Sequence, residues 1–580
     1  MSGVVLGVNF GTHDSAAAVV YDGTVLAAAE EERFTRQKHT KAFPTAAIDF
    51  CLHTAGVRPS DLASVAFFID PRLQRMLPLV NSWAAFPGSL GSLRSDLDKS
   101  ARGRTQLQLL RSHPGLQGAP AAIPVHHHRA HAASAYLTSD FDDAVVVTFD
   151  GRGEYETACI FEGRGGQLRK RHATLYPHSV GYFYSMLTRY LGFRPQHDEY
   201  KIMGLAGYGD DSLVASVRQL VSFDPGRGRI RLNLRYFDHH RRPSPARQLY
   251  SDALVQLLGP PREPESPLTD RHRAVAFAAQ RVLEEVVLGY LRFARRLVGL
   301  RTLCLAGGVA LNGVANRLVL ESGEFDEVFV QPAAGDAGTS IGAALLRGRD
   351  LGTTTRTAMR NAFLGPDHPE VAITESLASL RSQEHHVERT SDPAAAAARL
   401  LAQDAIIGWF QGRAEFGPRA LGARSILSAA GDAGVGLRIN ARIKRRELFR
   451  PLAPAVLDTA ADEYFAIAPG GRHVYPFMLA TAQALPRAES RTPSVVHVDG
   501  SARVQTVSAD DNPLFARLLR EFAALTGVPV VLNTSFNDAD EPIVGTPGDA
   551  VRTYHEARLD ALVIGPYVVR NLREEGSPRT

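Results

Sequence analysis

The most constraining feature of this sequence is a pattern of strands and glycine turns that occurs twice. VVLGVNF (4–10) is followed by the polar turn GTHDS, by AAAVVY, by Asp-Gly at 22–23 and by TVLAAAEE. AVVVTFD (144–150) is followed by the turn GRGEYET, by ACIFEG and, after a second glycine-rich turn, by QLRKRH. Asp-Gly between two apolar runs is a strong signal for a β-hairpin. The pattern predicts a duplicated lobe in which each copy offers a turn to phosphates in a shared cleft; two unrelated hairpins are the alternative.

The remaining segments predict an α/β protein of more than one domain, because 580 residues are too many for a single core. Residues 71–120 predict an irregular, partly helical insertion, whereas 271–299 has the apolar spacing of a long amphipathic helix. TLCLA and VFVQP predict buried strands, each followed by a glycine turn and a helix, which brings backbone close to a ligand. The polar, turn-rich stretch 351–369 predicts the domain junction. We expect a second α/β domain after it and a disordered tail at 571–580.

The composition excludes several classes of protein. The 65 basic and 61 acidic residues give a formal charge of +4, too near balance for nucleic acid to be the main partner. Three cysteines lie far apart without a C-x-x-C pair, which supports neither a zinc finger nor a disulfide framework and is typical of a reducing cytoplasm. We find no signal-peptide pattern and no stretch of the ~18 apolar residues that a membrane span needs. We therefore expect a cytoplasmic protein without nucleic-acid or membrane partners.

Four histidines lie within six positions of the stretch VPVHHHRAHAASA. His127 and His131 occupy positions i and i+4, which places both imidazoles on one face of a helix and suits a single metal ion. Asp150 ends an apolar strand and Asp336 lies at a strand-to-helix turn, so two carboxylates would complete a mixed nitrogen and oxygen set typical of Fe, Mn or Zn. The alternative is a surface or capping cluster of histidines. The sequence alone does not bring these four residues together.

A second concentration of charge covers residues 410–456, where arginine and lysine are interleaved with Gly and Pro. Arginine binds phosphate and carboxylate through two parallel hydrogen bonds, and lysine adds a point charge. Because glycine permits close backbone approach and few aromatic side chains are available for base stacking, the segment predicts a site for a small, phosphate-bearing substrate. A solvated basic face or a nucleic-acid surface is the alternative. GVPVVLNTSFN (527–537) predicts a strand whose polar end lies where open α/β sheets bind ligands, or an ordinary strand-end turn.

Ten motifs together resemble the O-carbamoyltransferases of the nodulation-protein and antibiotic-tailoring family. In order they are GVNFGTHDSAA, EEERFTRQKH, HHHRAHAASA, VVVTFDGRGE, DEYKIMGLAGYG, LCLAGGVALN, GDAGTSIGAA, GRAEFGPRALGARSIL, KRRELFRPLAPAV and LNTSFN, and the match spans roughly residues 4–568. The resemblance implies an actin-like N-terminal domain over residues 1–355, of the ASKHA type with duplicated ribonuclease-H-like lobes. It also implies a C-terminal α/β domain over residues 356–570 that is similar to threonylcarbamoyl-adenylate synthase.

The resemblance implies two consecutive reactions. Carbamoyl phosphate and ATP give carbamoyl adenylate, pyrophosphate and phosphate in the C-terminal domain, and the N-terminal domain transfers the carbamoyl group to a hydroxyl of a small-molecule acceptor. The expected acceptor is a secondary metabolite, as in antibiotic biosynthesis. The expected cofactors are Fe(II) or another divalent metal in the N-terminal domain and Mg²⁺ with ATP, and a homodimer is the default expectation. The alternative function is a transfer-RNA modification enzyme of the threonylcarbamoyl type, which would need a basic RNA surface.

The resemblance also assigns residues to these sites. Our candidate for the base that deprotonates the acceptor is His13, which could instead contact phosphate, and Lys38 would neutralise the adenylate phosphate. The implied metal ligands are His127, His131, Asp150 and Asp336. The residues implied to line the nucleotide in the first domain are Lys201, Gly307, Gly308 and Asn312. Those implied to hold carbamoyl phosphate and the ATP phosphates in the second domain are Arg419, Arg424, Lys444, Arg450, Arg503 and Ser535.

Overall fold

The computed structural model describes residues 3–241, 249–380 and 385–571. The chain forms two compact units. Unit 1 comprises Met1–Glu31, His39–Met359 and Pro469–Gly471, and unit 2 comprises Glu32–Lys38, Arg360–Ala468 and Arg472–Thr580. Each unit is therefore assembled from segments that are not continuous in sequence. The tail for which we expected disorder lies outside the described residues from position 572 onward.

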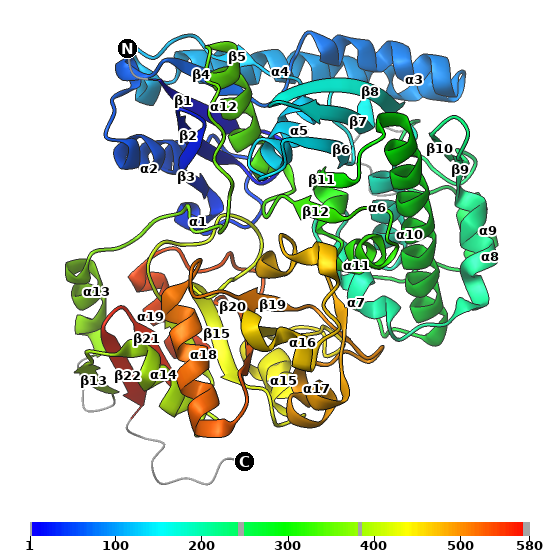
Figure 1. Cartoon of the computed structure of the whole chain (residues 1–580). Coiled ribbons are helices and arrows are strands. Elements are labelled where there is room, and N and C mark those ends of the chain that lie inside the picture. Colours follow the sequence, from blue (N-terminus) through cyan, green and yellow to red (C-terminus); the bar gives the residue numbers. More distant parts are fainter. Residues whose placement is uncertain (1–2, 242–248, 381–384, 572–580) are drawn as a thin grey trace. The chain divides into compact units, whose positions relative to one another are not determined.

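Unit 1 contains two five-stranded sheets with the same strand order (Figure 1). The first is β3-β2-β1-β4-β5 and the second is β8-β7-β6-β11-β12. In each sheet three strands form an antiparallel meander. A fourth strand pairs in parallel with the first strand of the meander, and a fifth strand pairs in parallel with the fourth. This repeat confirms the prediction of an α/β fold with duplicated ribonuclease-H-like lobes. The strands are β1 (Val4–Asn9), β2 (Ala16–Tyr21), β3 (Thr24–Glu30), β4 (Ser64–Phe67), β5 (Ile123–Pro124), β6 (Asp143–Phe149), β7 (Glu156–Arg164), β8 (Gln167–Leu175), β11 (Thr302–Ala306) and β12 (Glu327–Val330).

The hairpin between β2 and β3 follows from its two turn residues. Asp22 and Gly23 both take positive φ angles, of 43° and 75°. A type I′ turn requires positive φ at both central positions, and its twist matches that of the two strands that it joins. The Asp-Gly signal in the sequence therefore fixes the pairing of the first lobe.

Two helices fill the space between the sheets of unit 1 (Figure 1). Helix α12 (Thr339–Asp350) packs on β1 and β2, α5 (His127–Tyr136) packs on β6 and β11, and the two helices pack on each other. Small side chains permit this close packing, because α5 contributes four buried alanines. The far sides are covered by α2 (Thr45–Ala55), which packs on β2 and β3, and by α10 (Asp270–Val298), which packs on β6. Helix α10 confirms the amphipathic helix predicted over residues 271–299.

The remaining helices of unit 1 surround the second sheet. The insertion 71–120 lies between strands β4 and β5 of the first sheet and contains α3 (Leu77–Ala85) and α4 (Leu93–Ser112), so it is more regular than the sequence suggested. The other helices are α6 (Val180–Tyr190), α7 (Glu199–Ala206), α8 (Val214–Val217), α9 (Asp252–Leu258) and α11 (Gly313–Glu321), with the two-stranded ribbon β9 (Val221–Asp224) and β10 (Arg229–Leu232). None of the described helices combines the length and the apolar character needed to cross a membrane.

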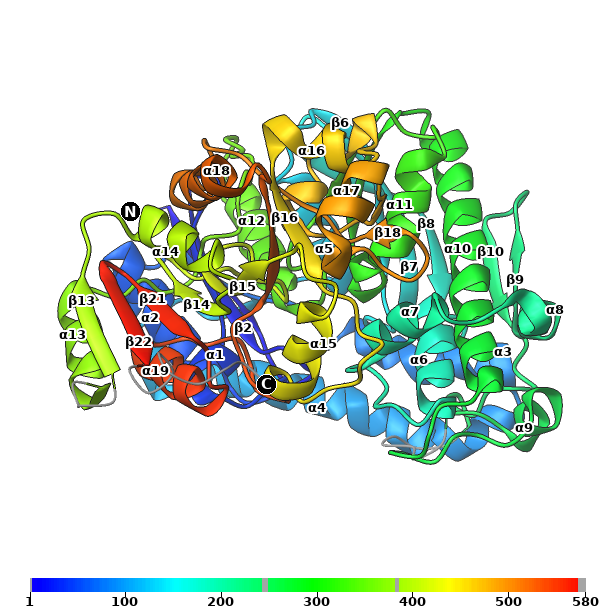
Figure 2. The same ribbon diagram turned by 90° about the horizontal axis from the view of Figure 1, so that it is seen from below.

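Unit 2 is built on one mixed eight-stranded sheet with helices on both faces (Figure 2). Its strand order is β13-β22-β21-β14-β15-β20-β16-β19. Helices α14 (Pro393–Leu401) and α18 (Pro513–Thr526) pack together over one face. Over the other face, α13 (Glu370–Leu377), α15 (Val435–Arg438) and α19 (Pro547–Glu556) enclose an apolar core. The strands are β13 (His385–Arg389), β14 (Ile407–Phe410), β15 (Arg424–Ala429), β16 (Ala453–Leu457), β19 (Gln505–Val507), β20 (Val530–Ser535), β21 (Ala561–Ile564) and β22 (Tyr567–Asn571).

We predict that Gly342→Ala destabilises unit 1, because a Cβ at this position of α12 would lie 1.8 Å from the carbonyl oxygen of Ala130 in α5. Forcing the two helices apart should cost about 1–3 kcal/mol of unfolding free energy. The matched control is Gly348→Ala in the same helix, where the nearest atom to a Cβ is Thr353 Oγ1 at 3.7 Å. Calorimetric melting of both variants tests the packing; equal melting temperatures would show that α5 and α12 are not in close contact.

Candidate metal centre and phosphate-binding cluster

Two of the four clustered histidines are held by the protein itself. His126 is the N-cap of α5: its Nδ1 accepts a hydrogen bond from the Arg129 amide at 3.2 Å, and its Nε2 lies 2.8 Å from Glu156 Oε2. The ring nitrogens of His128 lie 2.8 Å from Thr148 Oγ1 and 3.0 Å from the carbonyl oxygen of Glu156. Burial, helped by the neighbouring histidines, lowers the pKa of His128 to about 3. Both rings therefore have structural partners.

The other two histidines meet two carboxylates in the interior of unit 1. His127 Nε2 lies 3.2 Å from Asp150 Oδ2 and 3.6 Å from Asp336 Oδ1, and His131 Nε2 lies 3.5 Å from the same Asp336 oxygen. One ligand atom from each of the four residues lies within 4.8 Å of every other, so the group could hold a metal ion. The structure thus brings together four residues that are separated by up to 209 positions in the sequence, from His127 to Asp336.

The chemistry of this group suits a divalent cation. Both ring nitrogens of His131 are buried and accept or donate no hydrogen bond within the described residues. Burial alone would lower the pKa of His127, but its hydrogen bond to Asp150 and the nearby Asp336 raise that pKa to about 9. The pKa of Asp150 is held well below its usual range, because His127 and His131 outweigh the effect of burial. Two imidazoles and two carboxylates are a donor set that first-row divalent metals bind.

The turn that carries Asp150 is held rigidly against α5. The side chain of Ser179, the N-cap of α6, donates to the carbonyl oxygens of Asp150 and Gly151, at 3.1 and 2.9 Å. Gly153 lets this turn approach the histidines, because a Cβ there would lie 2.9 Å from Cδ2 of His127. Gly153 in GRGEYET therefore serves close packing, whereas a Cβ at Gly151 would meet no atom within 4 Å.

His13 lies beside the metal-binding group, whereas Lys38 belongs to unit 2. His13 Nδ1 lies 2.9 Å from Asp14 Oδ2, and Asp14 Oδ1 lies 2.6 Å from His39 Nδ1. Burial alone would lower the pKa of His13, but Asp14 and Asp336 raise it to about 10. Thr12 donates to Asp336 Oδ2 at 2.8 Å, so the first glycine turn touches the metal-binding group. The carboxylates of Asp14 and Asp336 therefore favour the protonated form of His13.

The four residues predicted to line a nucleotide in unit 1 have different neighbours. Gly308 lies next to the metal-binding group, since a Cβ there would be 3.5 Å from Asp150 Oδ1. Gly307 has a φ of +91° and packs on strand β6. Asn312 caps α11 and exchanges two hydrogen bonds of 3.0 Å with Gln280. The Lys201 ammonium lies 3.6 Å from Asp198 Oδ2 and 5.4 Å from the centre of the Phe193 ring.

In unit 2, Lys444 is buried at the end of β20. Its ammonium donates to the carbonyl oxygen and hydroxyl of Ser535, the latter at 3.2 Å, and to the carbonyl and side-chain oxygens of Asn537 at 3.0 and 2.6 Å. Burial lowers the pKa of Lys444 well below its usual range, and the cations of Arg446, Arg450 and Lys38 lower it further. Lys444 and Ser535, both predicted from the sequence, are therefore in direct contact.

The positive charge around Lys444 extends to Arg503. Burial and three other arginines, Arg419, Arg446 and Arg450, lower the pKa of Arg503 well below its usual range. Its Nε is shielded from solvent and has no acceptor among residues 3–241, 249–380 and 385–571. We call Lys38, Arg419, Lys444, Arg446, Arg450 and Arg503 the cation cluster. The repulsion among these groups would be relieved by a bound polyanion such as a phosphate.

Arg424 is not part of the cation cluster in this structure. Its side chain is fully buried on β15 and donates to the carbonyl oxygens of Gln411, Gly412, Ala423 and Pro366 at 2.8–3.1 Å. The guanidinium also lies 3.7 Å from the centre of the Phe410 ring. These contacts fix the loop around residues 411–423, whereas Nε of Arg424 is buried without an acceptor among the described residues.

Comparison with known proteins now gives the family. The model described as carbamoyltransferase N-terminus matches residues 4–75 and 118–345, and the model described as carbamoyltransferase C-terminus matches residues 398–571. The chain belongs to the carbamoyltransferase family. The two matches leave out residues 76–117, which contain helices α3 and α4 of the insertion.

Relatives in the carbamoyltransferase family cover most of the chain. The nodulation protein NolNO of Sinorhizobium fredii is 38% identical over 96% of this chain and 79% of its own. The nodulation protein NolO of Bradyrhizobium diazoefficiens is 40% identical over 77% of this chain and 79% of its own. Among solved structures, HypF of T. kodakarensis overlaps 61% of this chain and 48% of its own, with 14% identity and a TM-score of 0.32, too low to support an argument.

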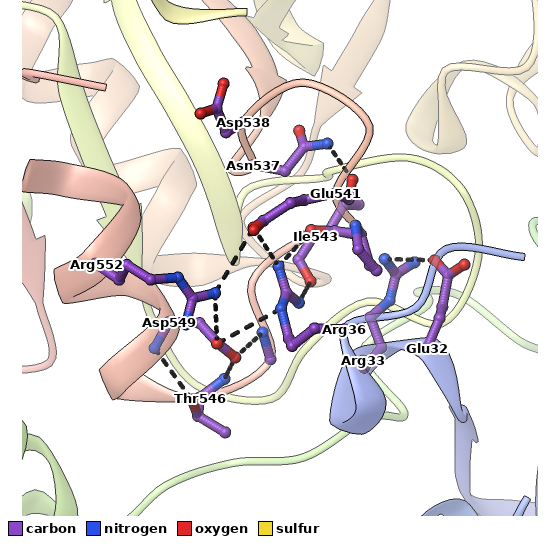
Figure 3. Close-up of polar contacts among 12 residues, drawn as sticks. Glu32, Arg33, Arg36, Asn537, Asp538, Glu541, Ile543, Thr546, Asp549 and Arg552 are labelled. Carbon is purple, nitrogen blue, oxygen red and sulfur yellow. Dashed lines mark hydrogen bonds and ion pairs between the residues drawn. The ribbon is translucent and has the colours of Figure 1, made fainter. Parts of the chain in front are cut away.

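Arg36 anchors a segment that sequence reasoning did not assign to any site (Figure 3). Its guanidinium donates to the carbonyl oxygens of Ile543 and Pro542 at 2.7 Å each and to Glu541 Oε2 at 3.2 Å, and its Nε lies 3.5 Å from Asp549 Oδ1. The Asn537 side chain donates to the carbonyl oxygen of Glu541 at 2.7 Å. The loop that holds Lys444 is thus tied to the segment that carries Lys38. Asn537, Arg446 and Arg36 lie within quoted motifs, but only contacts reveal their roles.

We predict that His127→Ala reduces bound metal at least tenfold, because it removes one of four ligand atoms. His128→Ala should keep the metal and instead lower the free energy of unfolding by about 1–3 kcal/mol, since it leaves buried partners unsatisfied. Metal analysis by inductively coupled plasma mass spectrometry of both purified variants distinguishes the two histidines. Equal metal loss in both variants would refute the assignment of His127 as a specific ligand.

We predict that Arg36→Gln lowers the free energy of unfolding of unit 2 by about 2–4 kcal/mol, because buried carbonyl acceptors lose a charged donor. The control is Arg552→Gln. Arg552 also contacts Glu541 and Asp549, at 3.6 and 3.0 Å, but its side chain is 41% exposed against 17% for Arg36. Urea unfolding of the two variants measures the difference, and a loss in Arg552→Gln as large as in Arg36→Gln would contradict the anchoring role.

Proposed function

We propose that this carbamoyltransferase makes carbamoyl adenylate in unit 2 and transfers its carbamoyl group to a hydroxyl of a small-molecule acceptor in unit 1. The observation that carries the proposal is the cation cluster around Lys444, which suits several phosphate groups at once. The metal-binding group of unit 1 supplies a second, chemically different site. Membership of the carbamoyltransferase family supports the carbamoyl group as the one transferred.

In unit 2 the substrates would be carbamoyl phosphate and ATP with Mg²⁺. Water and carbamoyl phosphate give carbamate and phosphate; a carbamate oxygen then attacks the α-phosphorus of ATP, and pyrophosphate leaves. The cations of Arg450, Arg503 and Lys444 would neutralise the phosphate oxygens and stabilise the charge that develops on them. Ser535 and Asn537 hold the Lys444 ammonium in place through four contacts. Lys38 would add charge next to Lys444, since it already depresses the pKa of that lysine.

In unit 1, His127, His131, Asp150 and Asp336 would hold a divalent metal, for which Fe(II) is our expectation. When bound, such an ion supplies a Lewis acid for a phosphate or carbonyl oxygen of the adenylate. The acceptor hydroxyl oxygen attacks the carbamoyl carbon, its proton moves to a base, and AMP leaves. His13 must be neutral to take that proton. Because Asp14 and Asp336 raise the pKa of His13 to about 10, a contact from its imidazolium to phosphate is the better-supported role in the metal-free chain.

The two half-reactions can be tested separately. We predict that Lys444→Ala lowers pyrophosphate release from ATP and carbamoyl phosphate at least 100-fold, because the phosphates lose their central cation, and spares transfer from supplied carbamoyl adenylate. His127→Ala should spare pyrophosphate release and should lower transfer from supplied carbamoyl adenylate. A phosphate assay in the absence of threonine also separates this function from the transfer-RNA alternative.

The control for Lys444→Ala is Arg438→Ala, which removes an exposed cation paired with Asp432 at 2.6 Å. It should change neither half-reaction. If the wild-type chain releases no pyrophosphate, the proposed function is wrong. If Lys444→Ala and His127→Ala each stop both half-reactions, the division of the chemistry between the two units is wrong.

A further inference from the structure

The side chain of Arg152 is a charged group in unit 1 that the proposed function does not use. It follows the strand end at Asp150 by two residues, on the turn that Ser179 fixes. Its Nε and Nη1 are shielded from solvent, and neither has an acceptor among residues 3–241, 249–380 and 385–571. The guanidinium lies 5.5 Å from the centre of the Tyr176 ring. Nearby Tyr182, Tyr176 and Asp96 outweigh burial and raise the pKa of Arg152, so the side chain is charged. Shielded donors without acceptors are costly, which points to a ligand that supplies acceptors for Nε and Nη1.

The carboxylates nearest to Arg152 are already engaged. Asp96 is buried on α4, where its Oδ1 accepts from the Lys99 ammonium at 3.0 Å and its Oδ2 accepts from the Asn81 amide at 3.0 Å. Asp150 Oδ2 lies 3.2 Å from His127. Neither carboxylate therefore forms an ion pair with Arg152.

A second cation, Lys99 on α4, lies close enough to Arg152 to be affected by its charge. The Lys99 side chain is only 18% exposed, and burial together with the charge of Arg152 lowers its pKa to about 8. Tyr182 and His239 stack nearby, with ring centres 4.7 Å apart and planes at 14°, and the Tyr176 hydroxyl donates to the carbonyl oxygen of His239 at 2.9 Å. Two largely shielded cations, Arg152 and Lys99, thus lie near the aromatic rings of Tyr176, Tyr182 and His239.

We propose that Arg152 and Lys99 form an oxyanion subsite that holds a phosphate or carboxylate group of a substrate next to the candidate metal centre. The identity of that substrate rests on the proposed function: the oxyanion is the phosphate of the adenylate donor or an anionic group on the acceptor alcohol. Arginine suits either, because its planar fork binds two oxygens at once.

The two cations of the subsite differ in whether the carbamoyltransferase N-terminal model matches them. Arg152 lies in a segment that the carbamoyltransferase N-terminal model matches, whereas Lys99 lies in the unmatched residues 76–117. A subsite completed by an insertion of this kind could adapt the family reaction to an acceptor that carries an acidic group.

Calorimetric titration of the full-length chain with inorganic phosphate tests the subsite. Arg152→Gln and Lys99→Gln should each weaken a phosphate-binding event at least tenfold, whereas Arg503→Gln, which affects the cation cluster of unit 2, should leave that event in place. The control is Arg102→Gln, an exposed arginine on α4. Phosphate binding by Arg152→Gln that equals wild-type binding would overturn the proposal.

Titration with AMP and with adenosine separates the two sources of the oxyanion. If the donor phosphate occupies the subsite, Arg152→Gln should lower the ratio of the affinity for AMP to the affinity for adenosine at least tenfold. If that preference is unchanged while inorganic phosphate binding is lost, the subsite serves an anionic acceptor. Both outcomes support an oxyanion subsite, and both are independent of whether the wild-type chain releases pyrophosphate, on which the proposed function depends.

Thermal melting tests whether Arg152 has a purely structural role. In phosphate-free buffer, Arg152→Gln should melt close to the wild-type temperature, because Nε and Nη1 have no acceptor among the described residues to lose. Added phosphate should raise the melting temperature of the wild type and not that of Arg152→Gln. A clearly lower melting temperature of Arg152→Gln without phosphate would show that the guanidinium serves the fold, and would overturn the proposal.

Discussion

Helix α5 is almost completely buried, and this burial determines what its side chains must do. Nine of its ten residues are enclosed by unit 1, so every polar atom on it needs a partner. His128 finds its partners in Thr148 and a carbonyl group, and the N-cap His126 finds them in a backbone amide and Glu156. The Nε2 atoms of His127 and His131 instead face the carboxylates of Asp150 and Asp336, and a shared cation would stabilise that arrangement. The same burial requires small residues on both α5 and α12.

Unit 2 has the opposite charge arrangement. Lys444 is buried among cations and is held by oxygen atoms of Ser535 and Asn537, which are neutral. Since neutral acceptors stabilise an ammonium less than a carboxylate does, the positive potential of the cluster remains available to a ligand. Unit 1 thus gathers histidines and carboxylates that suit a cation, whereas unit 2 gathers cations that suit an anion. This difference fits the two half-reactions that we propose for the two units.

The sequence predicted the elements of the fold better than the details of the sites. Strand repetition, the Asp-Gly turn and the spacing of His127 and His131 depend on local periodicity, so they can be read from sequence. Asp150 and Asp336 could be placed only by resemblance, because their approach depends on how the sheets of unit 1 pack. Arg424 shows what contacts add to a motif: both of its terminal nitrogens donate to backbone carbonyl groups, whereas its Nε has no acceptor among the described residues. Nε and Nη1 of Arg152 likewise have no acceptor among the described residues, and no sequence pattern signals this.

Residues 32–38 leave unit 1 after strand β3 and are built into unit 2 before the chain returns at His39. Through Arg36 they are bonded to the 541–549 segment, and Lys38 contributes to the potential at Lys444. No single cut in the gene can therefore yield both units complete: a fragment that begins at the 351–369 junction would lack seven residues of unit 2. Gene fission at this junction would leave residues 32–38 of unit 2 on the piece that carries unit 1.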